Sequence, residues 1–244
     1  SGDPAGTTDG VQRLALQPVP GPFRAGLRLR VEPAGERSMT MSGQLRFDFL
    51  RQIRLGAHYG AIGPVFALLA DRDSCELLFH REKRYWLSAR DEPDWGRLNP
   101  AAWTRAVEWA LAPASLVQEI EFESAGPATG HEGSGAWARS GRLRASGLGI
   151  RLRGDAGSGA LQDVSLWDGV DPILSIRFES YDRRDEALLP RKLSIYSPRD
   201  RLRVDLEILG WAPEEPGGEA ASMLRPEGWL PVREGDVPSY LPQP

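Results

Sequence analysis

The fold is decided by a stretch near the amino terminus, Met39-Thr-Met-Ser-Gly-Gln-Leu-Arg-Phe-Asp-Phe49, in which apolar and polar residues alternate. Side chains of a β-strand project to opposite faces with a period of two, so this strand has one apolar and one polar face. The same alternation precedes it at Leu27, Leu29 and Val31. Such a pattern is typical of antiparallel sheets with one face in the core and one in water.

Turn signals rich in Gly, Pro and Asp divide the flanking sequence into short strands. Six strands are predicted from about residue 23 to residue 90, and strands return from Val117 onward. Between them, Asn99 and Pro100 suit the start of a helix, which Pro113 would end. A helix inside a β chain suggests a curved sheet with the helix packed into its concave face. The sequence therefore predicts a mainly β fold, a single incomplete antiparallel β-barrel of about eleven strands.

Composition excludes several classes of protein. The 244 residues carry a net charge of −4, which argues against a dedicated nucleic-acid binder, and the single Cys excludes an internal disulfide. We expect a flexible polar tether over residues 1–22 and the half-barrel over 23–211. We expect a Pro-rich tail over 212–244 that packs on the barrel or seals it.

The sequence offers no catalytic cluster. His58, His80 and His131 are scattered and show no metal-ligand spacing, and no nucleotide-binding or serine-nucleophile motif is present. Cys75 alternates with apolar neighbours and is expected in the core. We therefore predict no enzymatic activity, no metal and no cofactor.

The remaining feature is an apolar sheet face larger than one helix can cover. Either the sheet closes on itself or it leaves an apolar hollow, and a hollow would suit an acyl chain or another apolar ligand. The residues expected to line the hollow come from the sheet and from the helix: Met39, Met41, Leu45, Phe47, Leu55, Leu69, Leu77, Trp103 and Val107.

Three segments carry a resemblance to a known family: Phe23-Arg-Ala-Gly-Leu-Arg-Leu-Arg-Val31, Ser42-Gly-Gln-Leu-Arg-Phe-Asp-Phe49 and Arg54-Leu-Gly-Ala-His58. Their order and alternation resemble the opening strands of the LolA/LolB-like lipoprotein-carrier superfamily. Leu189-Pro-Arg-Lys-Leu-Ser-Ile195 is similar to a hairpin strand of the same family. The resemblance covers about residues 23–211 and implies an incomplete barrel, capped by helices, whose apolar cavity holds lipoprotein acyl chains without chemistry.

The resemblance also implies roles for single residues. The LolB form exposes a hydrophobic residue on an early inter-strand loop, which corresponds here to Tyr59–Pro64 and to Ile62. The carrier form uses a strand arginine to hold a lid helix, and either Arg46 or Arg51 lies in the corresponding region.

The function implied by the resemblance is transport or insertion of lipid or lipoprotein at the bacterial outer membrane. Its partners would be acyl chains and, with them, the outer membrane or an envelope protein, and no nucleic acid. We expect a monomer in the periplasm, anchored to the outer membrane through an N-terminal lipid. The alternative is a non-catalytic structural or interaction module of the cell envelope whose cavity is filled by its own side chains.

Overall fold

The computed structural model describes residues 5–33, 35, 37–49, 51–96, 98–123, 135–184, 187–199, 201–214 and 227–232. The chain divides into two compact units, which are described separately. Unit 1 comprises residues 1–19 and 108–199, and unit 2 comprises residues 20–107 and 200–244. The division falls within helix α2 (Pro100–Leu111).

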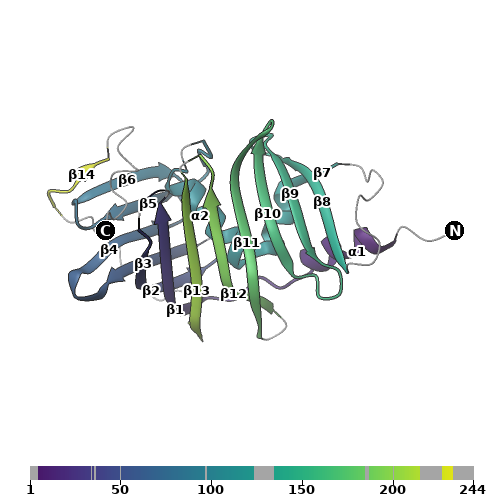
Figure 1. Ribbon diagram of the computed structural model, residues 1–244, viewed down its shortest axis with the longest axis horizontal. Coiled ribbons are helices and arrows are strands. Elements are labelled where there is room, and N and C mark those ends of the chain that lie inside the picture. Colours follow the sequence, from purple (N-terminus) through teal and green to yellow (C-terminus); the bar gives the residue numbers. More distant parts are fainter. Residues whose placement is uncertain are drawn as a thin grey trace. The chain divides into compact units, whose positions relative to one another are not determined.

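Unit 2 is built on an antiparallel sheet with the strand order β6-β5-β4-β3-β2-β1-β13 (Figure 1). A short strand, β14, pairs in parallel with β6 at the end of this strand order. A 3-10 turn, Gly60–Ile62, joins β3 to β4. The strand bounds are β1 (Phe23–Pro33), β2 (Met39–Asp48), β3 (Gln52–Tyr59), β4 (Gly63–Ala70), β5 (Ser74–Phe79), β6 (Arg84–Ala89), β13 (Leu202–Pro213) and β14 (Leu230–Pro231).

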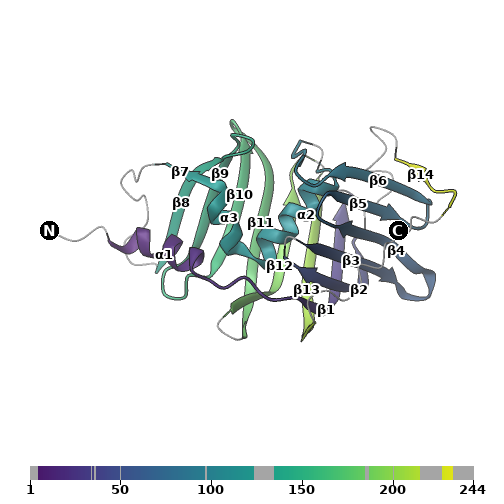
Figure 2. The ribbon, with the colours of Figure 1, turned by 180° about the vertical axis from the view of Figure 1, so that it is seen from behind.

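Unit 1 contains an antiparallel sheet with the order β12-β11-β10-β9-β8-β7, and two helices lie on one of its faces (Figure 2). Helix α1 packs against helix α3 and strand β8. The bounds are α1 (Ala5–Ala15), α3 (Pro113–Glu119), β7 (Ile120–Phe122), β8 (Ala136–Leu143), β9 (Gly149–Asp155), β10 (Leu161–Asp168), β11 (Asp171–Arg184) and β12 (Ala187–Ser197).

The alternation read from the sequence sets the two faces of the unit 2 sheet. Along β1, the residues from Phe23 to Val31 are alternately buried and exposed. Gly43 on β2 allows the close packing of this face, because a Cβ there would lie 2.5 Å from a Leu29 methyl carbon and 2.7 Å from the Gly56 carbonyl oxygen. Cys75 is fully buried, as expected for a core position.

The predicted fold class is confirmed: the protein is mainly β, with few helices and an open antiparallel arrangement. In each unit, the order of the described strands does not return to its first strand. Among the described residues 14 strands are defined, more than the eleven expected, and β7 and β14 are the shortest of them.

Two local predictions were wrong. Residues 5–15, expected within a flexible tether, form helix α1, and its Leu14 is fully buried. The predicted strand from Val117 is instead the end of helix α3, because Pro113 ends α2 and then serves as the first residue of a new helix. Strand β7 begins only at Ile120.

Candidate functional site

The unit 2 sheet presents one continuous apolar face, which we call the inner face. Directly paired residues of neighbouring antiparallel strands project to the same side. The pairing joins three rows across six strands, which are apolar except for Ser88 and Arg84 on β6. Their members, given from β1 to β6, are Phe23–Phe47–Ile53–Ala70–Cys75–Ser88, Ala25–Leu45–Leu55–Leu68–Leu77–Trp86 and Leu27–Gly43–Ala57–Phe66–Phe79–Arg84.

The inner face is the side on which helix α2 begins. The amide nitrogen of Ala101, in the first turn of α2, donates a hydrogen bond of 2.9 Å to the hydroxyl oxygen of Ser88. The helix is capped by Asn99, whose side-chain oxygen accepts a hydrogen bond from the Ala102 amide. The Asn99-Pro100 signal therefore places the helix start against the edge of the apolar face.

Burial varies among the residues of this face. Its centre is closely packed, because Phe47 and Ile53 are fully buried and Leu45 is 3% exposed. Toward β6, however, Phe66, Leu77 and Trp86 are only half-buried, although each pairs within the apolar rows. The accessible part of the inner face toward β6 therefore consists of these three side chains, because Leu68, Cys75 and Phe79 in the same rows are buried.

Most of the residues expected to line the hollow share this face. Met39, Met41, Leu45, Phe47, Leu55 and Leu77 lie on it by register. Trp103 and Val107 lie on α2, the former half-buried and the latter buried. Their role in binding a ligand stays a prediction.

Leu69 was wrongly assigned to the inner face. It pairs with Arg54, whereas Leu68 pairs with Leu55, so Leu69 projects to the opposite side, the outer face. The run from Pro64 to Ala70 is apolar throughout and lacks the alternation that would have revealed its register.

The inner-face residues that were not predicted to line the hollow include Ile53, Phe66, Leu68 and Trp86. Ile53 alternates with Leu55 and Ala57 in the sequence and could have been included. Phe66 and Leu68 lie in the same uninterrupted apolar run as Leu69. Trp86 follows Tyr85, and two adjacent aromatic residues give no indication of which one faces inward.

The turn between β3 and β4 exposes an apolar side chain at the place expected from the family resemblance. Ile62 is 68% exposed in the 3-10 turn Gly60–Ile62, and Tyr59 beside it is 39% exposed. The turn immediately precedes the strand that carries Phe66. Whether Ile62 contacts a membrane or cargo stays a prediction.

The two arginines considered for holding a lid helix lie on the outer face and in a turn. Arg46 projects to the outer face, where its Nε donates a hydrogen bond of 2.6 Å to Glu214 and its Nη2 donates a second one. This hydrogen bond holds the pKa of the Glu214 carboxyl below its usual range and raises the Arg46 pKa. Arg51 is exposed in the turn after β2. The alternation of Leu45, Arg46 and Phe47 already placed Arg46 on the polar face of its strand, opposite the apolar face against which the helix was expected to pack.

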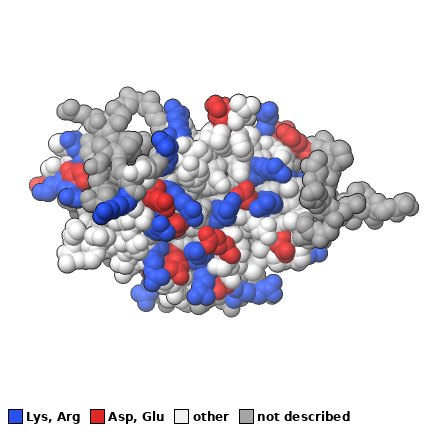
Figure 3. All heavy atoms as spheres, in the orientation of Figure 1, with Lys and Arg blue, Asp and Glu red and all other residues white. Residues whose placement is uncertain are grey.

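The outer face of unit 2 carries both basic and acidic side chains. Arg24, Arg46 and Arg54 lie in one row across β1, β2 and β3, and all three act on the Glu214 carboxylate. Burial, together with the neighbouring Arg46, lowers the pKa of Arg54. Figure 3 shows basic and acidic side chains interspersed over the strands. This face is suited to water rather than to an apolar ligand.

The chain's final described segment covers one apolar part of the outer face. Trp229 and Tyr85 pack against a buried cluster formed by Ala67, Leu69 and Leu78. The Trp229 ring also meets that of His80 edge-on, at a centroid distance of 5.2 Å. Burial, together with the neighbouring His58, lowers the pKa of His80.

Strand β14 continues this segment along the edge of β6. The Leu230 amide donates to the Lys83 carbonyl oxygen at 3.1 Å, and the Val232 amide donates to that of Tyr85 at 2.7 Å. This part of the tail therefore packs on the sheet, while residues 215–226 and 233–244 lie outside the described residues.

Within the described ranges, no three His, Cys, Asp or Glu side chains gather closely enough to hold a metal ion. No helix among those residues is long and apolar enough to cross a membrane.

No protein-family model and no curated protein sequence matches the chain. Solved structures do match it in fold. A LolA superfamily protein from Nitrosomonas europaea aligns with a TM-score of 0.60 at 7% identity, over 86% of this chain and 94% of that one. A domain assigned to outer membrane lipoprotein-sorting proteins, from Vibrio parahaemolyticus, aligns with a TM-score of 0.57 at 12% identity, over 85% and 91% of the two chains.

A DUF1329 family protein from Desulfovibrio piger aligns with a TM-score of 0.50 at 10% identity, over 86% of this chain and 93% of that one. All three alignments span most of both chains, and at these identities they report on the fold. The protein therefore has the fold of the LolA/LolB-like superfamily, as the order and alternation of its strands predicted.

Proposed function

We propose that this protein binds the acyl chains of a lipid or lipoprotein on its inner apolar face, and that it acts without catalysis in the bacterial cell envelope. The observation that carries the proposal is the row of apolar residues across β1 to β6 that ends in half-buried side chains, Leu77 and Trp86. A ligand reaching those side chains would remove apolar surface from water, at roughly 25 cal/mol per Å². The fold shared with lipoprotein-sorting proteins supports the same ligand class.

The finer form of the proposal concerns location and transfer. We place the protein in the periplasm at the outer membrane, held by an N-terminal lipid, with a role in lipoprotein or lipid transport or insertion. Ile62 would contact the membrane or the cargo, since an apolar side chain 68% exposed on a turn is suited to enter an apolar environment. The partners would be acyl chains and an envelope surface.

Ligand binding is tested by displacement of a fluorescent fatty acid from the full chain by oleate. Leu77→Glu puts a charge on the inner face and should abolish uptake of the probe. Leu87→Glu is the matched control, because Leu87 pairs with Glu76 on the outer face and is 50% exposed. Thermal unfolding of both variants establishes that they fold. Equal uptake by the two variants, or no uptake by the unchanged protein, would contradict the proposal.

Transfer is tested separately at the β3–β4 turn. Ile62→Glu should leave probe uptake unchanged and reduce association with lipid vesicles, whereas Ile62→Leu should preserve both. The side chain is exposed, so its replacement should not affect folding. Unchanged vesicle association of Ile62→Glu would remove Ile62 from the proposal without affecting the inner face.

A second candidate is a structural or interaction module with a self-filled interior. The near-complete burial of Met41, Leu45 and Phe47 favours it, because these side chains already occupy the centre of the face. Native mass spectrometry of protein recovered from cells separates the candidates. A bound lipid supports the first, and a ligand-free mass together with no probe uptake supports the second.

A further inference from the structure

Unit 1 carries a separate hollow of about 460 Å³ where β9, β10 and β11 meet. The residues that line it include two arginines and one glutamine, together with one glutamate and two aromatic residues. These are Arg153, Arg177, Gln162, Glu179, Phe178 and Tyr181. No part of it belongs to the inner face of unit 2.

Strand register brings the two arginines of the hollow together. Arg153 on β9 pairs with Asp163 on β10, and Asp163 pairs with Arg177 on β11, so all three side chains project to one face. Both arginines are exposed. The register shifts at Gln162 and at Glu179, and such irregularities redirect side chains out of the regular alternation.

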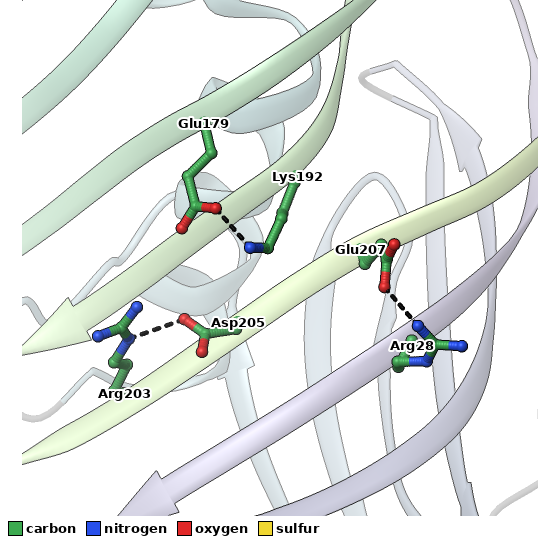
Figure 4. Close-up of polar contacts among 6 residues, drawn as sticks. All are labelled: Arg28, Glu179, Lys192, Arg203, Asp205 and Glu207. Atoms are coloured by element: carbon green, nitrogen blue, oxygen red, sulfur yellow. Dashed lines mark hydrogen bonds and ion pairs between the residues drawn. The ribbon is translucent and has the colours of Figure 1, made fainter.

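The charges around the hollow leave the two arginines available. Glu179 already forms an ion pair with Lys192, at 2.5 Å between Oε2 and Nζ (Figure 4). Asp163 lies between the arginines in register, and its Oδ1 accepts a hydrogen bond from the Ser165 hydroxyl. Within the part of the chain that the structure describes, neither Arg153 nor Arg177 forms a salt bridge.

Arginines on the outer face of unit 2 differ in this respect. Arg28 forms an ion pair with Glu207 at 2.8 Å, and Arg203 forms one with Asp205 at 2.8 Å (Figure 4). Charge pairing is thus common on exposed strands of this protein, whereas the hollow of unit 1 keeps a surplus of positive charge.

The aromatic wall of the hollow is fixed in place. The rings of Phe178 and Tyr181 stack at a centroid distance of 5.9 Å. The Tyr181 hydroxyl donates a hydrogen bond to the Leu161 carbonyl oxygen, and burial raises the Tyr181 pKa. The phenol therefore stays neutral and its ring is held in place.

We propose that this hollow binds a phosphate group, using Arg153 and Arg177 as paired donors and Gln162 as a third. Guanidinium groups present planar pairs of N–H donors that match phosphate oxygens, and such charge-assisted bonds are stronger than neutral ones. Asp163 opposes the anion and so limits its affinity. The phosphate can be carried by a lipid headgroup or be free in solution, because both present the same oxygens.

The test is a titration of the ¹⁵N-labelled full chain with inorganic phosphate and with glycerol 1-phosphate, followed by NMR. Shifts should be confined to the hollow, and Arg153→Gln and Arg177→Gln should each weaken binding by about tenfold or more. Arg151→Gln is the matched control, since Arg151 is exposed on the same strand and the same face but does not line the hollow. Asp163→Asn should tighten binding several-fold.

Two results would overturn the proposal: an equal loss of affinity in Arg151→Gln, which would indicate a general effect of surface charge, or shifts outside the hollow.

Sedimentation with phosphatidylcholine vesicles, with and without phosphatidylglycerol, then identifies the source of the phosphate. Binding to the anionic vesicles that Arg153→Gln abolishes indicates a headgroup. Phosphate binding without sedimentation indicates a soluble phosphate. Uptake of the fatty-acid probe is expected to be normal in both arginine variants. The proposals for this site and for the acyl-chain site are therefore tested independently.

Discussion

In each unit, a tryptophan packs between the sheet and a terminal segment of the chain. In unit 1 this tryptophan belongs to the sheet, whereas in unit 2 it belongs to the terminal segment. In unit 1 the sheet carries Trp137, which is 1% exposed and is covered by Gly10 of the N-terminal helix and Gly154 of β9. In unit 2 the C-terminal segment carries Trp229, which lies half-buried on a sheet patch.

The difference concerns how strongly each terminal segment is bound. A Cβ at Gly10 would lie 2.2 Å from Cδ1 of Trp137, and one at Gly154 would lie 2.5 Å from its Cε2, so no side chain fits at either position. The Trp137 Nε1 has no hydrogen-bond partner within the described residues. Helix α1 is thus part of the core of unit 1, whereas the segment around Trp229 is added to a completed sheet.

The largest expected effect comes from Trp137→Ala. Removing this fully buried indole should destabilise the protein by about 3–5 kcal/mol, since a cavity is added to the lost burial. Chemical denaturation measures the loss, and Trp137→Phe should lose less. If Trp137→Ala lost less stability than Trp229→Ala, the N-terminal helix would not be the more strongly bound of the two terminal segments.

A smaller effect is expected from Gly10→Leu, which forces α1 away from Trp137. Overpacking of this kind costs about 1–3 kcal/mol. Ala15→Leu adds the same side chain at an exposed position of the same helix and should be nearly neutral. Proteolysis within residues 5–15 should accelerate in Gly10→Leu alone. Equal proteolysis of both variants would show that α1 is not held through Gly10.

Trp229→Ala should cost about 1 kcal/mol, in the range of ordinary partly buried substitutions. Hydrogen exchange of the Leu230 and Val232 amides should accelerate, because both depend on the docking of this segment. Leu230→Ala, at a residue 54% exposed, should leave the Val232 amide protected. If Trp229→Ala leaves exchange unchanged, the backbone pairing alone holds the segment.

The smallest effect is expected at the Arg46–Glu214 pair, where the tail leaves β13. The pKa of Glu214 is lowered in the folded protein, so its contribution to stability is present above the usual carboxyl pKa of about 4.3 and is lost as the pH falls through the lowered value. Glu214→Gln should therefore be less stable than the unchanged protein at pH 7, by under about 1 kcal/mol. The two proteins should converge in acid, and a gap that persists there would point to packing instead.

Alternation explains how much of the fold the sequence could predict. Strands β1 and β2 have one buried and one exposed face, so their residues follow a strict period of two and their inner side chains were identified. Strand β4 is buried on both sides at Leu68 and Leu69, which removes the period, so Leu69 was placed on the wrong face.

Helix α1 shows a second limit of sequence reasoning. Its segment begins with a polar stretch and was therefore expected to be a tether, and its Gly6 and Gly10 also disfavour a helix. Gly10 and Trp137 are in contact but lie 127 positions apart in the chain, so no local sequence pattern indicates their contact. The hollow with Arg153 and Arg177 has no local signature either, since the two arginines come together only through the pairing of three strands.

Strand β14 has a consequence for the behaviour of the protein at high concentration. An open sheet ends in unpaired N–H and C=O groups, and such an edge can recruit a strand from another molecule. By pairing with Arg84 and Tyr85, the two residues of β14 occupy this edge of β6 with the protein's own backbone. The C-terminal segment thereby makes the first part of this edge unavailable to a strand from another molecule.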